Sequence, residues 1–231
     1  MKRALVTGAN RGIGLEVVRQ LLVREYEVFL TCRNPQKGEQ VLDFLGDSTG
    51  QLHIIELDVS EEELVNKAAR RFAERYDRLD VLVNNAGVLL DRSESILSVS
   101  EADLNETWNI NVLGALRVTR AFLPVLRNSE DARVINVSSL AGQLSSMGVW
   151  APAYSLSKTA LNAVTCILAN ELSSDGIAVN AVSPGWIKTD MGGLDAPGTL
   201  EDGADTIVWL AEEAPSSLVG QFLRDRKSVP W

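Results

Sequence analysis

A tyrosine and a lysine stand four residues apart in the stretch YSLSK, at Tyr154 and Lys158. Four residues make about one helical turn, so in a helix the two side chains share a face. A positive charge beside a phenol favours the phenolate and lowers its pKa, which suits the phenol to general acid catalysis if that pKa falls from about 10 toward the working pH. Such pairs also arise by chance, so the rest of the chain must supply the context.

The chain has too few histidines and cysteines for several other common kinds of active or metal site. The chain has one histidine, His53, and two cysteines, Cys32 and Cys166. These provide neither a disulfide framework nor a Cys/His zinc site, so we expect no metal and no mechanism built on a catalytic histidine. The net charge of -9, without a long basic run, argues against nucleic acid or an anionic membrane surface as a partner.

The N-terminal MKRALVTGAN has an apolar run too short for a signal-peptide core, and no later segment is apolar over enough residues to span a bilayer. We therefore expect a soluble, unsecreted, cytoplasmic protein. Its 231 residues, 45% of them hydrophobic, fit a single domain over 1–231 with a substantial core.

Short β-branched runs alternate with longer segments of helical period. The expected strands are 3–7, 27–31, 52–57, 80–85, 133–138, 178–183 and 220–223, and the helical pattern is clearest over 14–25, 60–76, 101–127 and 154–172. This alternation predicts an α/β fold, a doubly wound parallel sheet of Rossmann-like type with helices on both faces. Ser60 before Glu63 predicts a capping box for the helix that follows the third strand.

Two segments fit neither helix nor strand, 142–152 and 192–198. Both are rich in Gly, Pro, Ser and Ala, and each follows the carboxyl end of an expected strand. Open α/β sheets bind their ligands at that edge. The second segment has Gly192, Gly193 and Gly198 as candidate hinges for closure over a substrate, although it also fits a disordered crossing.

The first expected strand runs into TGANRGIG, where Gly8, Gly12 and Gly14 precede a helix. Glycines there allow a tight turn, let backbone N–H groups approach a pyrophosphate, and leave a helix N-terminus facing its charge. Alone, the G-x-x-x-G-x-G spacing fits a structural turn as well as a ligand site. The order of strand, loop, helix and second strand favours a dinucleotide.

The end of the second strand, LTCRN, indicates which dinucleotide. An NAD site usually offers an acidic side chain here, whereas a site for the 2′-phosphate offers an arginine. Cys32 stands in the acidic position, Arg33 follows it, and Arg11 lies inside the glycine loop. Two guanidinium groups converging on one phosphate predict NADP(H) rather than NAD(H).

Seven ordered motifs make nearly the whole chain resemble the short-chain dehydrogenase/reductase family. They are TGANRGIG at Thr7, LDVS at Leu57, NNAG at Asn84, NVLG at Asn111, NVSSLAG at Asn136, YSLSK at Tyr154 and SPGWIKTD at Ser183. TDMGG, EDGADTIVWLA and GQFLRD further resemble its carbonyl reductase branch. The resemblance implies a dinucleotide site mainly within 1–140 and catalytic and substrate elements mainly within 139–200.

The resemblance also implies roles for single residues. Asp58 would bond the adenine, the turn 84–87 would line the adenosine side, Ile187 and Thr189 would face the nicotinamide carboxamide, and Lys158 would also hold the nicotinamide ribose. The full expected cofactor set is Gly8, Asn10, Arg11, Gly12, Ile13, Gly14, Arg33, Asp58, Val59, Asn85, Ala86, Gly87, Tyr154, Lys158, Pro184, Gly185, Ile187 and Thr189.

Two further residues join the expected catalytic group. A serine at the carboxyl end of the strand RVINVSS can donate a hydrogen bond to a substrate oxygen. The family pattern, Ser before x-x-Gly, selects Ser139 over Ser138. Asn111 enters by the pattern Asn-x-x-Gly alone, as holder of a water that relays protons through Lys158. From the residues themselves, it equally fits a side chain bonded to a backbone carbonyl or a helix irregularity.

The residues expected beside the reacting centre are apolar, which suits a hydrophobic or aromatic ketone, aldehyde or quinone. They are Leu140, Leu144, Met147, Trp150, Trp186 and Met191, with Val149 and Leu194 nearby. Several, notably Leu140 and Leu144, equally fit the core. We expect an NADPH-dependent reduction in which Tyr154 is the general acid.

Two alternatives stay open. Reduction of a 3-oxoacyl thioester uses the same motifs and would be favoured by a basic patch at the site mouth, which the sequence does not show. A non-catalytic NADP(H) sensor or scaffold would not need all of Asn111, Ser139, Tyr154 and Lys158. The chain lacks the long insertion before Tyr154 associated with monomeric carbonyl reductases, so we expect a homodimer or homotetramer acting on a small-molecule carbonyl substrate.

Overall fold

The computed structural model describes residues 1–45, 51–92 and 95–231. Its eight strands form one sheet in the order β3-β2-β1-β4-β5-β6-β7-β8, and every neighbouring pair is parallel except β7 with β8. The strands are β1 (Arg3–Val6), β2 (Glu27–Cys32), β3 (Leu52–Glu56), β4 (Val81–Asn84), β5 (Arg133–Val137), β6 (Ala178–Val182), β7 (Phe222–Arg224) and β8 (Lys227–Ser228). The predicted doubly wound parallel sheet is confirmed.

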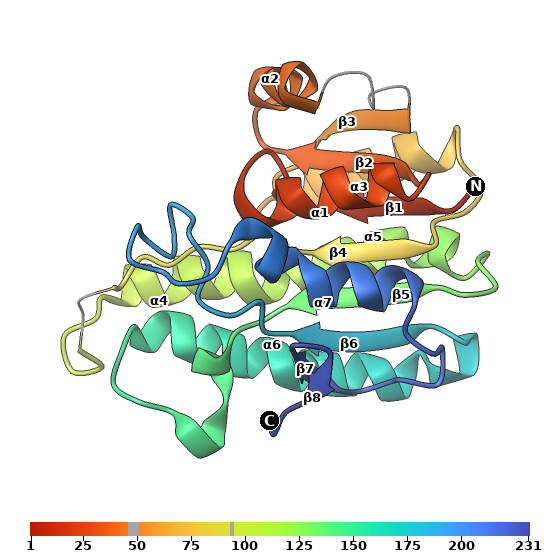
Figure 1. Ribbon diagram of the computed structural model, residues 1–231. Coiled ribbons are helices and arrows are strands. Elements are labelled where there is room, and N and C mark those ends of the chain that lie inside the picture. Colours follow the sequence, from red (N-terminus) through yellow and green to blue (C-terminus); the bar gives the residue numbers. More distant parts are fainter. Residues whose placement is uncertain (46–50, 93–94) are drawn as a thin grey trace.

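Helices cover both faces of this sheet (Figure 1). They are α1 (Gly12–Val23), α2 (Pro35–Leu45), α3 (Glu62–Ala73), α4 (Glu101–Trp108), α5 (Ala115–Leu126), α6 (Pro152–Glu171) and α7 (Leu200–Glu212). Short 3-10 turns occupy Leu140–Gly142, Leu144–Ser146 and Ser173–Asp175. Within the described ranges, no helix is long and apolar enough to cross a membrane.

Alternation along the strands divides the core into two layers. In β1, Ala4 and Val6 pack with α1 and α7 on one face, whereas Leu5 packs with α3, α5 and α6 on the other. Because successive strand side chains point to opposite faces, a strand buried on both sides is apolar throughout. The two layers pack against both faces of the sheet and so position the strand ends from which the loops at the carboxyl edge begin.

The expected helix over 101–127 contains an irregular turn. Asn109–Gly114 form a π-helical turn between α4 and α5. A π turn adds a residue to the helical repeat and often marks a functional position. Asn111 lies in this turn, so the helix irregularity considered for it is present.

The predicted capping box at Ser60 is wrong. The helix α3 begins at Glu62, and its N-cap residue Glu61 makes no side-chain cap bond. The Ser60 hydroxyl instead donates to Asp58 Oδ1 at 2.7 Å. Asp58 therefore takes the hydroxyl that a capping box would need. The charges of Glu62 and Glu63 stabilise the first turn of the helix instead.

The chain's last strands also differ from expectation. The final parallel strand is Phe222–Arg224, shifted from the predicted 220–223, and β8 folds back antiparallel beside it. Trp231 stacks on Phe222, with 5.6 Å between ring centroids. Gln143 Nε2 donates to the Pro230 carbonyl at 2.9 Å, which joins this end to the turn that follows Ser139.

Candidate active site

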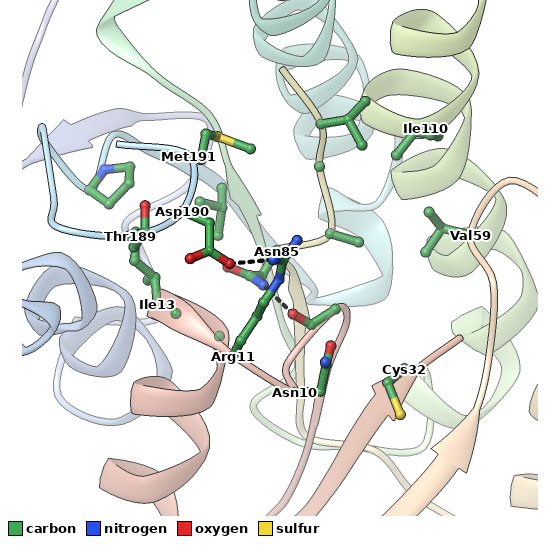
Figure 2. A pocket seen from close by; sticks show the side chains of 18 of the residues that line it. Asn10, Arg11, Ile13, Cys32, Val59, Asn85, Ile110, Thr189, Asp190 and Met191 are labelled. Carbon is green, nitrogen blue, oxygen red and sulfur yellow. Dashed lines mark hydrogen bonds and ion pairs between the residues drawn. The ribbon is translucent and has the colours of Figure 1, made fainter. Parts of the chain in front are cut away.

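A cavity of about 440 Å³ opens at the carboxyl edge of the sheet, where the strand order changes direction between β1 and β4 (Figure 2). This is the place where doubly wound folds bind ligands. Fifteen of the expected cofactor residues line it: Gly8, Asn10, Arg11, Gly12, Ile13, Gly14, Arg33, Val59, Asn85, Ala86, Gly87, Tyr154, Lys158, Pro184 and Thr189.

The glycine loop needs its glycines. Gly8 and Gly12 have φ of 61° and 58°, a region that side chains disfavour. A Cβ on Gly14 would stand 2.4 Å from the Asn85 amide nitrogen. That amide donates to the Thr7 carbonyl at 2.8 Å and to the Gly8 carbonyl at 3.2 Å. The loop after β4 therefore holds the loop after β1 in place through these hydrogen bonds. The glycine turn of the β1 loop lines the cavity.

Two arginines line the cavity. Arg11 forms an ion pair with Asp190, drawn as a dashed line in Figure 2, and both side chains are largely exposed. Arg33 has no hydrogen-bond or ion-pair partner among the residues that the structure describes, and it too lines the cavity. A cation without a partner beside a glycine turn fits a ligand that carries a phosphate.

Three expected cofactor residues do not line this cavity. The Asp58 carboxylate accepts hydrogen bonds from Ser60, Gly185 adopts a φ of 89°, and Ile187 is buried in a bridge with Gly198. Gly198 packs against Ile187, since its Cβ would lie 2.6 Å from Ile187 Cδ1. Gly185, Ile187 and Gly198 belong to the loop 185–198, whereas Asp58 follows β3.

The sequence did not place several lining residues. They are Cys32, Leu57, Val88, Ile110, Val137, Ser138, Lys188, Asp190 and Leu200, whereas Met191 was expected beside the substrate. Cys32, Leu57, Val137, Ser138, Lys188 and Asp190 lie in or beside motifs already singled out, so motif extent was a usable signal. Val88, Ile110 and Leu200 directly flank the motifs NNAG, NVLG and EDGADTIVWLA, but as ordinary apolar residues they gave no chemical signal of their own.

Tyr154 and Lys158 lie one turn apart on α6, as expected. Lys158 Nζ stands 5.5 Å from the centroid of the Tyr154 ring and donates to the Val137 carbonyl at 2.8 Å. Tyr154 is 8% exposed and Lys158 is 4% exposed. The strand β5 thus ends at a carbonyl that directs the lysine beneath the phenol.

Burial sets the acid strength of both groups. It raises the pKa of Tyr154 to about 12, against an opposing hydrogen bond with Ser139, and it lowers the pKa of Lys158 to about 8. The expected fall in the pKa of Tyr154 is therefore wrong for this structure, because loss of solvent outweighs the hydrogen bond from Ser139. The phenol is a neutral proton donor across the physiological range.

The structure separates the two serines at the end of β5. Ser138 is buried, and its hydroxyl donates to Asn162 Oδ1 at 2.6 Å, away from the tyrosine. The Ser139 side chain hydrogen-bonds Tyr154 and also accepts from the Ala141 backbone at 3.1 Å. Gly142 closes the turn against α6, where a Cβ would lie 2.6 Å from the Lys158 carbonyl carbon. The glycine thereby lets Ser139 approach Tyr154.

Asn111 bonds backbone groups on the cavity wall. Its Oδ1 accepts from the Val88 N–H at 2.8 Å, and its Nδ2 donates to the Val88 carbonyl at 3.0 Å and to Ser157 Oγ at 2.9 Å. The backbone-bonded alternative considered for this residue is thus present. Its contacts join the loop after β4 to the helix that carries Tyr154.

The expected apolar pocket is not enclosed. Of its six residues only Met191 lines the cavity, while Leu144, Trp150 and Trp186 are largely exposed. Leu144 lies in the second 3-10 turn after β5, Trp150 lies just before α6, and Trp186 lies in the loop after β6. Trp150 nevertheless touches the reacting centre, since its ring meets the Tyr154 ring edge to face at 6.0 Å between centroids.

Residues 2–197 match the family model described as short chain dehydrogenase. The chain is a short-chain dehydrogenase/reductase. The resemblance indicated by the seven motifs is confirmed, and the cavity lies where this fold binds ligands.

Individual members of the short-chain dehydrogenase/reductase family match nearly the whole chain. Short-chain dehydrogenase anuI of Penicillium roqueforti is 32% identical over 240 residues, covering 97% of this chain and 94% of that protein. The 3-oxoacyl-acyl-carrier-protein reductase FabG of Aquifex aeolicus is 30% identical over 238 residues, covering 96% and 94%. An NADPH-bound carbonyl reductase from chicken fatty liver superposes with a TM-score of 0.92 at 32% identity, covering 100% and 99%.

Proposed function

We propose that this protein is an NADPH-dependent reductase of hydrophobic or aromatic ketones, aldehydes or quinones. The observation that carries the proposal is the placement of Tyr154 at the wall of the dinucleotide cavity, with Ser139 hydrogen-bonded to its side chain and the Lys158 ammonium over its ring. When bound, NADPH supplies the hydride. The similarity to an NADPH-bound carbonyl reductase supports both the cofactor and the reaction class.

The chain's own residues would divide the remaining work. The Ser139 hydroxyl donates to the substrate oxygen and polarises it, and Tyr154 gives its proton to the developing alkoxide. The charge on Lys158 stabilises the phenolate that this transfer leaves behind. Asn111 supports the lysine side of the site by fixing Val88 and Ser157 in place.

The glycine turn and the arginines would hold the cofactor. The left-handed turn at Gly8 and Gly12 leaves backbone N–H groups free for the pyrophosphate. Arg33 and Arg11 would take the 2′-phosphate, and Arg11 would exchange Asp190 for it.

The test is consumption of NADPH with a panel of aromatic ketones, aldehydes and quinones, with NADH and Tyr154→Phe alongside. Turnover that depends on Tyr154 and prefers NADPH supports the proposal. Full activity of Tyr154→Phe would contradict the mechanism. Tight NADPH binding without turnover on any substrate would favour the sensor function.

A second candidate, reduction of a 3-oxoacyl thioester, is favoured by the similarity to FabG. Lys188 lines the cavity, and the Arg92 guanidinium donates to the Met191 carbonyl at its mouth. These two cations, beside the acidic Asp190, would be the groups available to an acidic carrier. An acetoacetyl thioester in the same panel distinguishes the two, because turnover of the thioester alone would select this second candidate.

We also propose that the protein self-associates through α5 and α6. A shallow cavity of about 290 Å³ between these helices is lined by apolar side chains such as Leu116, Leu123 and Val164, and Ile167 beside them is 62% exposed. Sedimentation of the wild type and of Ile167→Glu would test a dimer or tetramer, since a charge here must be desolvated on association.

Cys32 and Cys166 are free thiols, which supports a reducing cytoplasm as the location.

A further inference from the structure

The helix α6, which carries Tyr154 and Lys158, has no cap of its own. Its N-cap residue is Ala151, held in the left-handed region at φ 45°, and it offers no side-chain oxygen. Pro152 follows and has no N–H group. The first backbone donors that need an acceptor are therefore those of Ala153 and Tyr154, the positions that an N-cap side chain normally satisfies.

Asp91 supplies that acceptor from a distant part of the chain. Its Oδ2 accepts from the Ala153 N–H at 2.5 Å, and its Oδ1 lies 3.4 Å from the Tyr154 backbone nitrogen. Asp91 follows β4 in sequence, and its side chain is 0% exposed. One carboxylate, from the loop after β4, thus spans the first turn of α6.

The short segment 88–91 is fixed at both ends. At one end, Asn111 hydrogen-bonds the N–H and the carbonyl of Val88, which lines the cavity. At the other end, Asp91 accepts a hydrogen bond from the first turn of α6. A second path returns to the same residue, because Asn111 donates to Ser157 Oγ and Ser157 donates to the Tyr154 carbonyl at 2.7 Å. Both backbone polar groups of Tyr154 are therefore bonded to side chains.

A carboxylate that caps α6 from a buried position must lose its hydration, which is energetically unfavourable. Asp91 makes no ion pair among the residues that the structure describes, and a buried charge is unfavourable unless other groups compensate it. The two N–H groups and the positive end of a long helix provide that compensation. A local Ser or Thr cap would satisfy the same donors from within the helix, so the distant carboxylate adds a constraint between the loop after β4 and α6.

We propose that Asp91 is a positioning residue for Tyr154. It sets where the first turn of α6 stands relative to the loop after β4, and so fixes the phenol against Ser139 and Lys158. The inference rests on the proposed function, since it takes Tyr154 as the proton donor.

The test compares Asp91→Ala, Asp91→Asn and wild type in kcat, KM and NADPH dissociation constant, the last measured by calorimetry without substrate. Because small misplacement of a catalytic group costs about 10²-fold in rate, we expect Asp91→Ala to lower kcat by that order while KM and NADPH affinity stay within about twofold. Asp91→Asn keeps an acceptor oxygen at the same reach and should restore kcat to within about threefold of wild type.

Two controls separate positioning from general destabilisation. Ser100→Ala removes the cap of α4, where Ser100 Oγ accepts from the Asp103 N–H, and should leave kcat unchanged. In a Tyr154→Phe background, Asp91→Ala should cause no further loss, because residues that act through one group are not additive. An unchanged kcat in Asp91→Ala, or a loss that persists in full in the Tyr154→Phe background, would overturn the inference.

The outcomes also separate this inference from the proposed function. Full activity of Tyr154→Phe defeats the proposed function and the inference with it. An inactive Tyr154→Phe beside a fully active Asp91→Ala defeats the inference alone. If Asp91→Ala does not fold, Asp91→Glu replaces it: the longer side chain displaces the first turn and should lower kcat about tenfold at constant NADPH affinity. Equal kcat in Asp91→Glu and wild type would then overturn the inference.

Discussion

The ammonium group of Lys158 lies over the Tyr154 ring, 5.5 Å from its centroid, and is hydrogen-bonded to the Val137 carbonyl below. Burial favours the neutral form of each partner, raising the pKa of Tyr154 to about 12 and lowering that of Lys158 to about 8. Keeping Lys158 charged therefore lowers the stability of the folded state. In return, its charge can stabilise the Tyr154 phenolate that forms during proton transfer.

Lys158→Met should stabilise the protein at neutral pH and abolish turnover. The pKa of Lys158 is about 8 in the folded state, below the 10.5 of a free lysine, so the unfolded state binds more protons between these values and wild-type stability rises with pH there. The variant should gain on the order of 3 kcal/mol at pH 7, by about 1.4 kcal/mol per pKa unit, and lose that advantage toward pH 10.5. Urea denaturation at both pH values measures it.

The control for that measurement is Lys67→Met, which removes an exposed lysine of α3. Its free energy of unfolding should follow that of the wild type at both pH values. If the stability gain of Lys158→Met did not depend on pH, burial of the lysine's charge would not be what destabilises the wild type.

The rate of carbonyl reduction should fall as pH rises above about 8. Lys158 loses its charge there, whereas Tyr154 keeps its proton up to about 12, so the lysine governs this limb of the profile. Lys158→Arg should be slower at neutral pH but show no such limb, since a guanidinium stays charged. The measurement is kcat between pH 6 and 10. An identical limb in both proteins would assign it to another group.

Gly142→Ala should impair both stability and catalysis. The new methyl group would lie 2.6 Å from the Lys158 carbonyl carbon and 2.7 Å from the Thr159 nitrogen, so the turn behind Ser139 must move away from α6. Overpacking of this kind costs about 1–3 kcal/mol. Gly148→Ala is the matched control, because nothing lies within 4 Å of its added Cβ. Thermal denaturation and kcat should change in the first variant only.

Arg33→Ala should weaken NADPH binding selectively. A charge-assisted hydrogen bond contributes about 1.5–3 kcal/mol, so the dissociation constant of NADPH should rise at least about tenfold while that of NADH changes little. Calorimetric titration with both dinucleotides measures this. Arg70→Ala, on the exposed side of α3, should leave both constants unchanged. Equal weakening toward NADPH and NADH would refute a role for Arg33 at the 2′-phosphate.

The sequence predicts those parts of the molecule that local patterns encode. Apolar runs define the parallel strands, and the positive φ of Gly8 and Gly12 agrees with the tight turn inferred from the glycine spacing. The choice of Ser139 over Ser138 by the spacing to Gly142 agrees with their contacts, because that spacing reflects a steric need where the turn meets Lys158.

What the sequence could not predict depends on contacts between distant residues. Asp91 stands beside no motif, and its role appears only when β4 and α6 are placed together. The pKa of Tyr154 depends on burial, which a Tyr–Lys spacing does not report. The exposure of Leu144 and Trp186 depends on the path of loops whose glycine-rich and serine-rich composition specifies no single backbone.

The distant cap on α6 also limits how far the catalytic apparatus can be moved. Ser139, Tyr154 and Lys158 fall within twenty consecutive residues, which makes 139–158 look like a cassette that could be grafted between scaffolds. Its first helical turn, however, is completed by Asp91, its lysine donates to the Val137 carbonyl just outside the stretch, and its Ser157 accepts from Asn111. A graft that carried only this stretch would keep every reactive group and lose their alignment, so the smallest transferable unit includes the loop after β4 and the π turn.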